Sequence, residues 1–191
     1  SEEDVKCSEA ILEGTRKDGS AVRVGYLSGT PSHNKDFATI TAALAELLGK
    51  HPEMRLVLAG PLDTDDTLTA FANQIERVPF APRKEYFGTV AGLDINLAPL
   101  EIGNPFCESK SELKWFEAGL FAVPTVAAAT GTFKGAITEG VDGFTAATSA
   151  EWIEKLGQLV AGTGAGDLPE VADAQRSPFP FGSSVVNLTR V

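Results

Sequence analysis

Short apolar runs alternate with helical stretches along most of this chain, and this alternation constrains the fold more than any other feature of the sequence. The apolar runs predict strands at residues 22–28, 55–60, 78–80, 94–99, 124–128 and 144–146. Apolar residues at helical spacing predict helices at residues 37–48 (ended by Gly49), 67–75, 83–91, 111–121 and 149–160. Strands that take turns with helices are joined by right-handed crossovers, so we predict an α/β fold with a mostly parallel sheet covered on both faces.

The alternating pattern occupies the middle of the 191-residue chain, which is long enough for one domain with a short appendage. Residues 21–161 form the predicted domain. Residues 1–20 are polar and are expected to be a linker or arm from a preceding domain. Residues 162–191 turn rich in Gly, Pro and Ser and are expected to form an irregular tail. Because the first residue is Ser rather than Met, we expect the chain to be cut from something longer.

Charge and composition argue against several classes of protein. With 26 acidic and 16 basic residues the net charge is −10, so a nucleic acid partner is not expected, since phosphate backbones require a basic face. No apolar run reaches the roughly 18 residues of a transmembrane helix. Cys7 and Cys107 provide no disulfide framework, and no secretory signal is visible. We expect a cytoplasmic protein, with membrane contact only through a missing domain.

The loops that follow strands are where ligands bind in parallel sheets, so these loops hold the candidate site. The first such loop contains Gly29, Thr30, Asn34 and Lys35. A glycine allows the backbone to approach a ligand, the following helix amino terminus attracts anions, and the lysine adds a positive charge. This combination suits a phosphate, although a capped turn with a solvated lysine explains it equally well.

A second loop, residues 99–110, runs into the helix predicted at 111–121. Lys110, Lys114 and Glu117 share one stripe of that helix, next to a stripe expected to face the core, formed by Leu113, Phe116 and Leu120. Glu117 therefore lies at the edge of the buried face, where an unpaired carboxylate is costly. It could simply pair with one of the lysines. We favour the alternative that it contacts a ribose while the lysines lie near a diphosphate, because the stripe follows a strand's carboxyl end.

Other chemistries find less support. The glycines of residues 130–135 and 139–144 could close over a ligand, yet a plain loop and a β-turn explain them as well. The two histidines, His33 and His51, offer no catalytic relay. The acidic run at residues 63–66 is better explained by helix capping than by a metal, so no metal site is predicted.

Taken together, the segment from Val22 to about Val160 resembles the carboxy-terminal, nucleotide-sugar-binding domain of retaining GT-B glycosyltransferases of group 1. The blocks that carry the resemblance are 25–30 with 34–36, 94–100, 110–119, 123–127 and 139–144. Their order and spacing are fairly specific, whereas each block alone is not.

The resemblance implies a Rossmann-like half of a two-domain enzyme that binds its donor in the cleft between the halves. Lys35 matches the family's lysine for the diphosphate, and Glu117 matches the glutamate that holds the ribose. Backbone amides near Lys110 and Ser111 would face phosphate and sugar. The predicted donor-binding residues are Gly29, Thr30, Asn34, Lys35, Asn104, Glu108, Lys110, Ser111, Lys114 and Glu117.

The sequence also departs from the family pattern. Eight residues before Glu117, where the family has a glutamate, stands Ser109, and Glu108 is one place off. The segment looks like a Lys-Ser-x-x-Lys variant in which Lys110 and Lys114 take over part of the anion binding. The family's Gly-Phe-Gly and its first-loop arginine are absent.

The first hypothesis is the donor-binding domain of a glycosyltransferase that transfers a sugar from a nucleotide-diphosphate sugar with retention. It needs no cofactor beyond the donor, no catalytic residue is assigned, and its partner is the missing amino-terminal acceptor domain, without which turnover should be poor or absent. The shifted Glu108 motivates an alternative, a non-catalytic nucleotide- or partner-binding module of the same fold. A second alternative, half of a sugar-nucleotide epimerase, needs acid–base residues that the sequence does not reveal.

Overall fold

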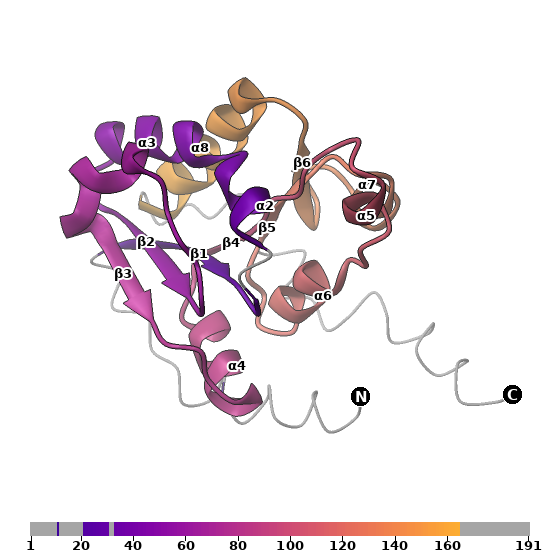
Figure 1. Ribbon diagram of the computed structural model, residues 1–191, viewed down its shortest axis with the longest axis horizontal. Helices are drawn as coiled ribbons and strands as arrows, with labels where there is room; N and C mark the ends of the chain where they lie inside the picture. The colour runs from indigo at the N-terminus through magenta and orange to yellow at the C-terminus, as the bar shows by residue number, and fades with distance from the viewer. Residues whose placement is uncertain (1–10, 12–20, 31–32, 165–191) are drawn as a thin grey trace, which may run out of the picture.

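A parallel sheet forms the centre of the structure, a computed structural model that describes residues 11, 21–30 and 33–164 (Figure 1). Its strands are β1 (Val22–Leu27), β2 (Met54–Ala59), β3 (Ile75–Val78), β4 (Ile95–Ala98), β5 (Thr125–Ala128) and β6 (Gly143–Ala146). The described strands follow the order β3-β2-β1-β4-β5-β6, and every neighbouring pair is parallel. The order reverses between β1 and β4, as in a Rossmann-like sheet, so the predicted fold class is confirmed.

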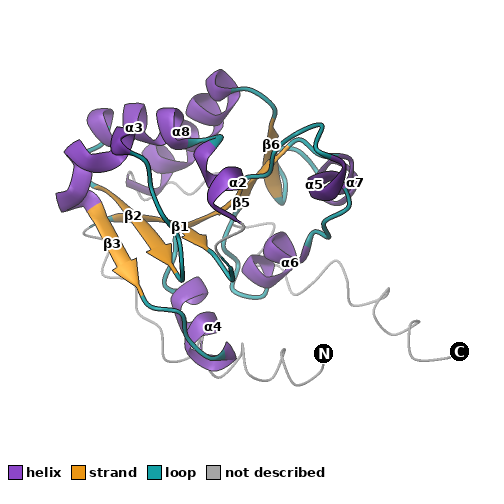
Figure 2. Cartoon of the chain, in the orientation of Figure 1, coloured by secondary structure: helices purple, strands orange, loops and turns teal. Residues whose placement is uncertain are grey.

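Helices cover both faces of this sheet (Figure 2). The described helices are α2 (Asn34–Ala38), α3 (Thr41–Lys50), the 3₁₀ segment η2 (Asp66–Gln74), α4 (Arg83–Ala91), α5 (Pro105–Glu108), α6 (Leu113–Gly119), α7 (Gly131–Ala136) and α8 (Ser149–Gly164). The pairs α3 with α8 and α4 with α6 pack on opposite faces, each pair over its own cluster of buried apolar residues. In the part of the chain that the structure describes, no helix is both long and apolar enough to cross a membrane.

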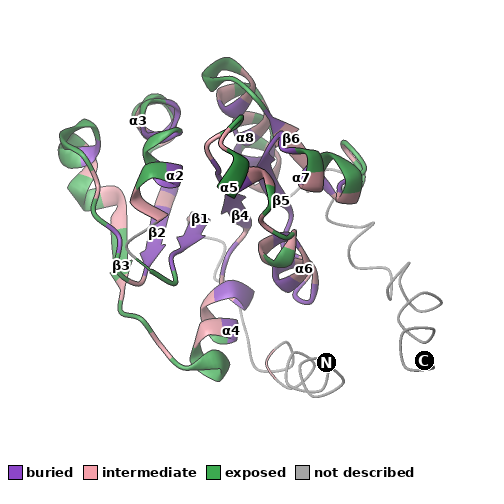
Figure 3. Ribbon diagram, turned by 45° about the vertical axis from the view of Figure 1, so that its right-hand side comes forward, coloured by how far each residue is buried: buried purple, intermediate pink, exposed green. Residues whose placement is uncertain are grey.

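The core explains why the strand sequences are almost continuously apolar. In β2, Leu56 and Leu58 join the cluster under α3 and α8, while Val57 joins the cluster under α4 and α6. Strands β4 and β5 are buried along their whole length, because helices cover both of their faces (Figure 3). The edge strand β3 is only partly buried and carries the polar residues Glu76 and Arg77.

The helix predicted at 37–48 is two helices in the structure, which corrects the prediction. Thr39, Ile40 and Thr41 are consecutive β-branched residues, which are stiff in a helix, and the chain turns there before α3 begins. The predicted end at Gly49 is also wrong, because α3 includes Gly49 and Lys50. Pro52 disfavours helical backbone at the residue before it, and His51 is accordingly non-helical.

Several further elements differ from the prediction. The strand expected at 78–80 lies at Ile75–Val78, because Pro79 has no N–H to donate to a neighbouring strand. The loop expected at 130–135 contains α7, which Thr130 caps by accepting a hydrogen bond from the Phe133 amide. The predicted tail begins at residue 162, whereas α8 continues to Gly164. Apart from Ile11, the predicted arm at 1–20 lies outside the described residues, and so does the tail from residue 165 onward.

Candidate functional site

A cavity of about 360 Å³ opens at the carboxyl ends of β1 and β4, the point where the strand order reverses. Its wall combines Leu27 at the end of β1, Gly29 in the loop that follows, Pro99 and Leu100 after β4, and side chains of α4 and α6. Ligands bind at this switch point in open parallel sheets. The topology therefore places the cavity where the sequence analysis expected a site.

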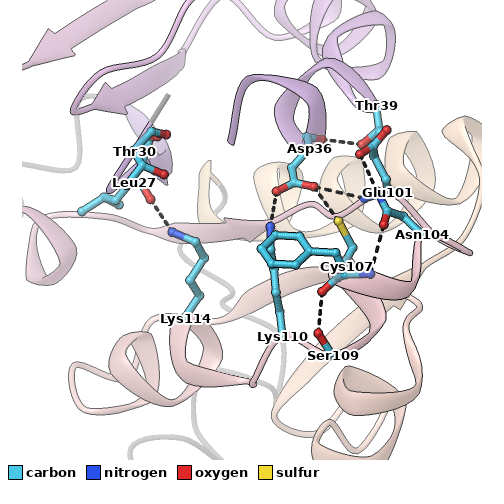
Figure 4. A network of polar contacts seen from close by, with 12 residues as sticks. Leu27, Thr30, Asp36, Thr39, Glu101, Asn104, Cys107, Ser109, Lys110 and Lys114 are labelled. Carbon is cyan, nitrogen blue, oxygen red and sulfur yellow. Dashed lines mark hydrogen bonds and ion pairs between the residues drawn. The ribbon is translucent and has the colours of Figure 1, made fainter. Parts of the chain in front are cut away.

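Two lysines from the β4–α6 region reach this cavity (Figure 4). The Nζ of Lys110 lies 2.6 Å from Oδ2 of Asp36 and also faces the ring of Phe106. The Nζ of Lys114 donates a hydrogen bond to the carbonyl of Leu27 and lies 5.1 Å from the ring centroid of Tyr26. Burial lowers the pKa of Lys114 from its usual value to about 8. Two cationic groups thus line one cavity.

Asp36 is the anchor for this arrangement, and it is buried in α2. Besides the ion pair, its carboxylate accepts hydrogen bonds from the Cys107 thiol at 3.2 Å and from the Glu101 amide at 3.3 Å. Burial and the neighbouring carboxylate raise the pKa of Cys107, which keeps the thiol protonated. Asp36, Glu101 and Cys107 offer metal-binding atoms within 4.8 Å of one another, but the ammonium of Lys110 already occupies Asp36 and repels a cation.

Glu117 of α6 also lines the cavity and is only 6% exposed. The hydroxyl of Tyr86 donates to its Oε2 at 2.7 Å, and Nη1 of Arg83 lies 3.6 Å from its Oε1. Both partners come from α4, so the simple ion pair with Lys110 or Lys114 considered above is not what the structure contains. Burial and the hydrogen bond to Glu117 raise the pKa of Tyr86.

The orientation of α6 corrects one prediction. Leu113, expected in the core, is 53% exposed, whereas Trp115 and Ala118 are buried. The indole N–H of Trp115 donates a hydrogen bond to the Asp142 carbonyl. Lys114 and Glu117 of the same helix line the cavity.

The structure brings five of the predicted donor-binding residues together in the cavity. These are Gly29, Lys110, Ser111, Lys114 and Glu117. The other predicted residues lie outside its wall. Lys35 is exposed on α2, and Asn34 exchanges hydrogen bonds with Asp63.

The remaining three predicted residues make contacts within the surrounding loops. The Thr30 carbonyl accepts a hydrogen bond from the Ser28 hydroxyl. Asn104 caps α5 by accepting from the Phe106 amide. Glu108 accepts from the amides of Gly103 and Gly131, so it joins two loops, and these bonds lower its pKa.

Sequence reasoning missed Asp36, Tyr86 and His33 as members of the site. Asp36 is not among the predicted donor-binding residues, and His33 enters the sequence analysis only as a histidine that offers no catalytic relay. Both follow β1 directly, and Tyr86 lies on a helix that follows a strand, so position after a strand was the available signal. In the acidic run the capping interpretation is confirmed, since Asp65 accepts from the Thr67 amide at the start of η2.

Comparisons with known proteins support this picture. A family model described as "Glycosyl transferases group 1" matches residues 21–162. No curated protein matches the chain.

Several solved structures share the fold. HepE from Anabaena, in complex with UDP, is 18% identical, with a TM-score of 0.59 over 92% of this chain and 47% of HepE. The C-terminal domain of LpcC, a group 1 glycosyl transferase from Francisella tularensis, is 17% identical, with a TM-score of 0.62 over 88% of each chain. Sucrose-phosphate synthase from Thermosynechococcus elongatus is 13% identical, with a TM-score of 0.59 over 93% of this chain and 47% of the synthase. The chain thus spans about half the length of HepE and of the synthase.

Proposed function

The chain belongs to the group 1 glycosyltransferases, and we propose that it is the donor-binding domain of an enzyme that transfers a sugar from a nucleotide-diphosphate sugar with retention. Its fold is that of the carboxy-terminal domain of GT-B glycosyltransferases. HepE, similar in fold, has been solved with UDP and with UDP-glucose, which supports a nucleotide sugar as the ligand.

The observation that carries the proposal is the convergence of Lys110, Lys114 and Glu117 in one cavity at the switch point. Two ammonium groups in a partly buried space favour the binding of a diphosphate, because a low local dielectric constant strengthens their attraction for anionic oxygens. Burial disfavours the charged form of Lys114 in the folded protein, and an anionic ligand would offset that effect. The backbone at Gly29 can approach the phosphates closely.

Glu117 supports the ribose assignment. Its carboxylate accepts one hydrogen bond from Tyr86, and a carboxylate can accept about four in all. A ribose diol has two hydroxyl donors, which fit within that remaining capacity. Tyr86 and Arg83 hold the carboxylate in place and offset the cost of burying its charge.

In a charge-stabilising role the domain needs no nucleophile of its own. Lys110 and Lys114 would stabilise the charge that develops on the leaving diphosphate. The chain covers about half the length of HepE and of the synthase, and the acceptor would bind in the other half of such an enzyme. Turnover by the chain alone should therefore be poor or absent.

One observation favours a second candidate, a non-catalytic module that binds a nucleotide or a partner. Glu108, the residue nearest to the family's first glutamate, joins two loops outside the cavity wall. A residue committed to loop structure is not available to contact the sugar.

Calorimetric titration of the chain with UDP, GDP and ADP tests the proposal. We expect saturable binding of one of them, weakened about tenfold or more by Glu117→Gln and left unchanged by Glu85→Gln, an exposed glutamate on α4. The Lys35→Ala variant, titrated in the same series, tests whether that exposed lysine contributes to nucleotide affinity. Binding that survives Glu117→Gln unchanged contradicts the ribose assignment, and no binding of any nucleotide favours the partner-binding module.

A further inference from the structure

His33 lies in the cavity wall with an unusual atomic environment. Its Nδ1 is buried and, among the residues that the structure describes, has no hydrogen-bond partner. A buried polar atom without a partner costs free energy, and such atoms in native structures call for an explanation. An atom of a bound ligand is one such partner, and this wall already faces a ligand-sized cavity.

Three charged side chains act on His33. Lys114 of α6 and Lys110 of the preceding loop are cationic, whereas Asp36 of α2 is anionic and already paired with Lys110. Tyr26 of β1 presents its ring at 6.5 Å. Burial, together with Lys114 and Lys110, lowers the pKa of His33, and Asp36 opposes this only in part. The free protein therefore holds a neutral imidazole at neutral pH.

A diphosphate in the cavity counteracts the effect of these positive charges on His33. Its negative charges lie among Lys110, Lys114 and His33, so they cancel the repulsion between the lysines and an imidazolium. An anionic oxygen also accepts a hydrogen bond from a protonated ring nitrogen, which gives the buried Nδ1 a partner if the oxygen reaches it.

We propose that His33 binds a proton when a diphosphate occupies this cavity and then acts as a third cation on the phosphate oxygens beside Lys110 and Lys114. This inference rests on the proposed function, since it takes the diphosphate as the occupant. Binding at near-neutral pH is then coupled to proton uptake, and affinity falls as the pH rises through the interval between the free and bound pKa of His33. By linkage this dependence is at most about tenfold per pH unit for one proton.

The chain is well suited to a direct test, because it contains two histidines, His33 and His51. His51 follows α3, pairs with Glu53 and does not line the cavity, so it is a control within the same molecule. Histidine ring resonances are followed by NMR from pH 5 to 8 in the free protein, with saturating pyrophosphate, and with whichever of UDP, GDP and ADP binds. We expect the pKa of His33 to rise by about one or more on saturation and that of His51 to stay unchanged.

Calorimetry of the His33→Gln variant gives an independent readout. We expect its nucleotide affinity to be reduced several-fold at pH 6 and to approach that of the wild type at pH 8, where the imidazole is neutral in the complex as well as in the free protein. A nucleotide that binds while the pKa of His33 stays unchanged overturns the inference and leaves the proposed function standing. If neither pyrophosphate nor any nucleotide binds, the proposed function fails together with the inference.

Discussion

Lys114 should make the folded protein less stable than a neutral side chain would. Burial lowers its pKa from the usual 10.5 to about 8, and that displacement corresponds to roughly 3 kcal/mol of destabilisation of the folded state at neutral pH. Replacing the ammonium by an apolar side chain of similar length removes the penalty. The same substitution forfeits the hydrogen bond to the Leu27 carbonyl, worth about 1 kcal/mol. We therefore expect Lys114→Met to stabilise the protein by about 2 kcal/mol at pH 7.

The pH dependence has a definite sign. Between pH 8 and 10.5 the unfolded state binds more protons at Lys114 than the folded state does, so the penalty falls as the pH rises. It is complete below about pH 8 and absent above about pH 10.5. The advantage of Lys114→Met should therefore be largest at pH 7 and should disappear near pH 10.5.

A second lysine in the same cavity provides the contrast. Lys110 neutralises the buried Asp36, so Lys110→Met leaves an unpaired buried carboxylate and should destabilise the protein by about 3–5 kcal/mol. Lys84→Met, at an exposed position of α4, should change stability by no more than about 0.5 kcal/mol.

Urea unfolding at pH 7 and pH 10.5 measures these free energies, and thermal unfolding gives a second reading. For a chain of this length, 2 kcal/mol corresponds to a rise in Tm of about 4–8 °C. Calorimetry should show that the more stable Lys114→Met protein has lost at least tenfold in nucleotide affinity. A Lys114→Met protein that is less stable than the wild type at pH 7, or equally stabilised at both pH values, would refute the reasoning.

Two other substitutions test the surroundings of the site. Gly60 has a φ of +82°, and an added Cβ would lie 2.0 Å from the Ser28 carbonyl oxygen, so Gly60→Ala should lower the urea midpoint by the equivalent of about 2 kcal/mol or more. Gly88→Ala in α4, where a Cβ meets nothing within 4 Å, should instead stabilise by about 0.5–1 kcal/mol, and equal effects of the two would contradict the strain argument. Tyr86→Phe removes the donor to Glu117 and should cost about 1 kcal/mol of stability and several-fold in nucleotide affinity; unchanged affinity would show that the hydroxyl does not position the carboxylate.

The sheet could be predicted because its signal is local. Strands β4 and β5 are buried on both faces, so their sequences are almost continuous apolar runs. The longer helices between strands are recognised by apolar residues at helical spacing. The burial of Trp115 and the exposure of Leu113 on α6 could not be predicted, because the Trp115 indole donates a hydrogen bond to a turn that is distant in sequence. Helix α7, little more than one turn long, has no apolar periodicity to detect.

In the candidate site, too, features with a local sequence signal could be predicted, and features that depend on distant contacts could not. Lys110, Lys114 and Glu117 could be predicted together because they share one helical stripe beyond a strand. Their partners could not, because Asp36 is 74 residues from Lys110 and Tyr86 is 31 residues from Glu117. Such pairs form only when the sheet brings the ends of its strands together, and the spacing of residues in a single sequence does not reveal them.

A crystal structure of the chain with whichever of UDP, GDP and ADP binds tests the central claim most directly. We expect the diphosphate between Lys110 and Lys114, and the ribose hydroxyls within hydrogen-bonding distance of the Glu117 carboxylate. A nucleotide bound elsewhere on the domain, with this cavity empty and both lysines still on Asp36 and Leu27, would contradict the account.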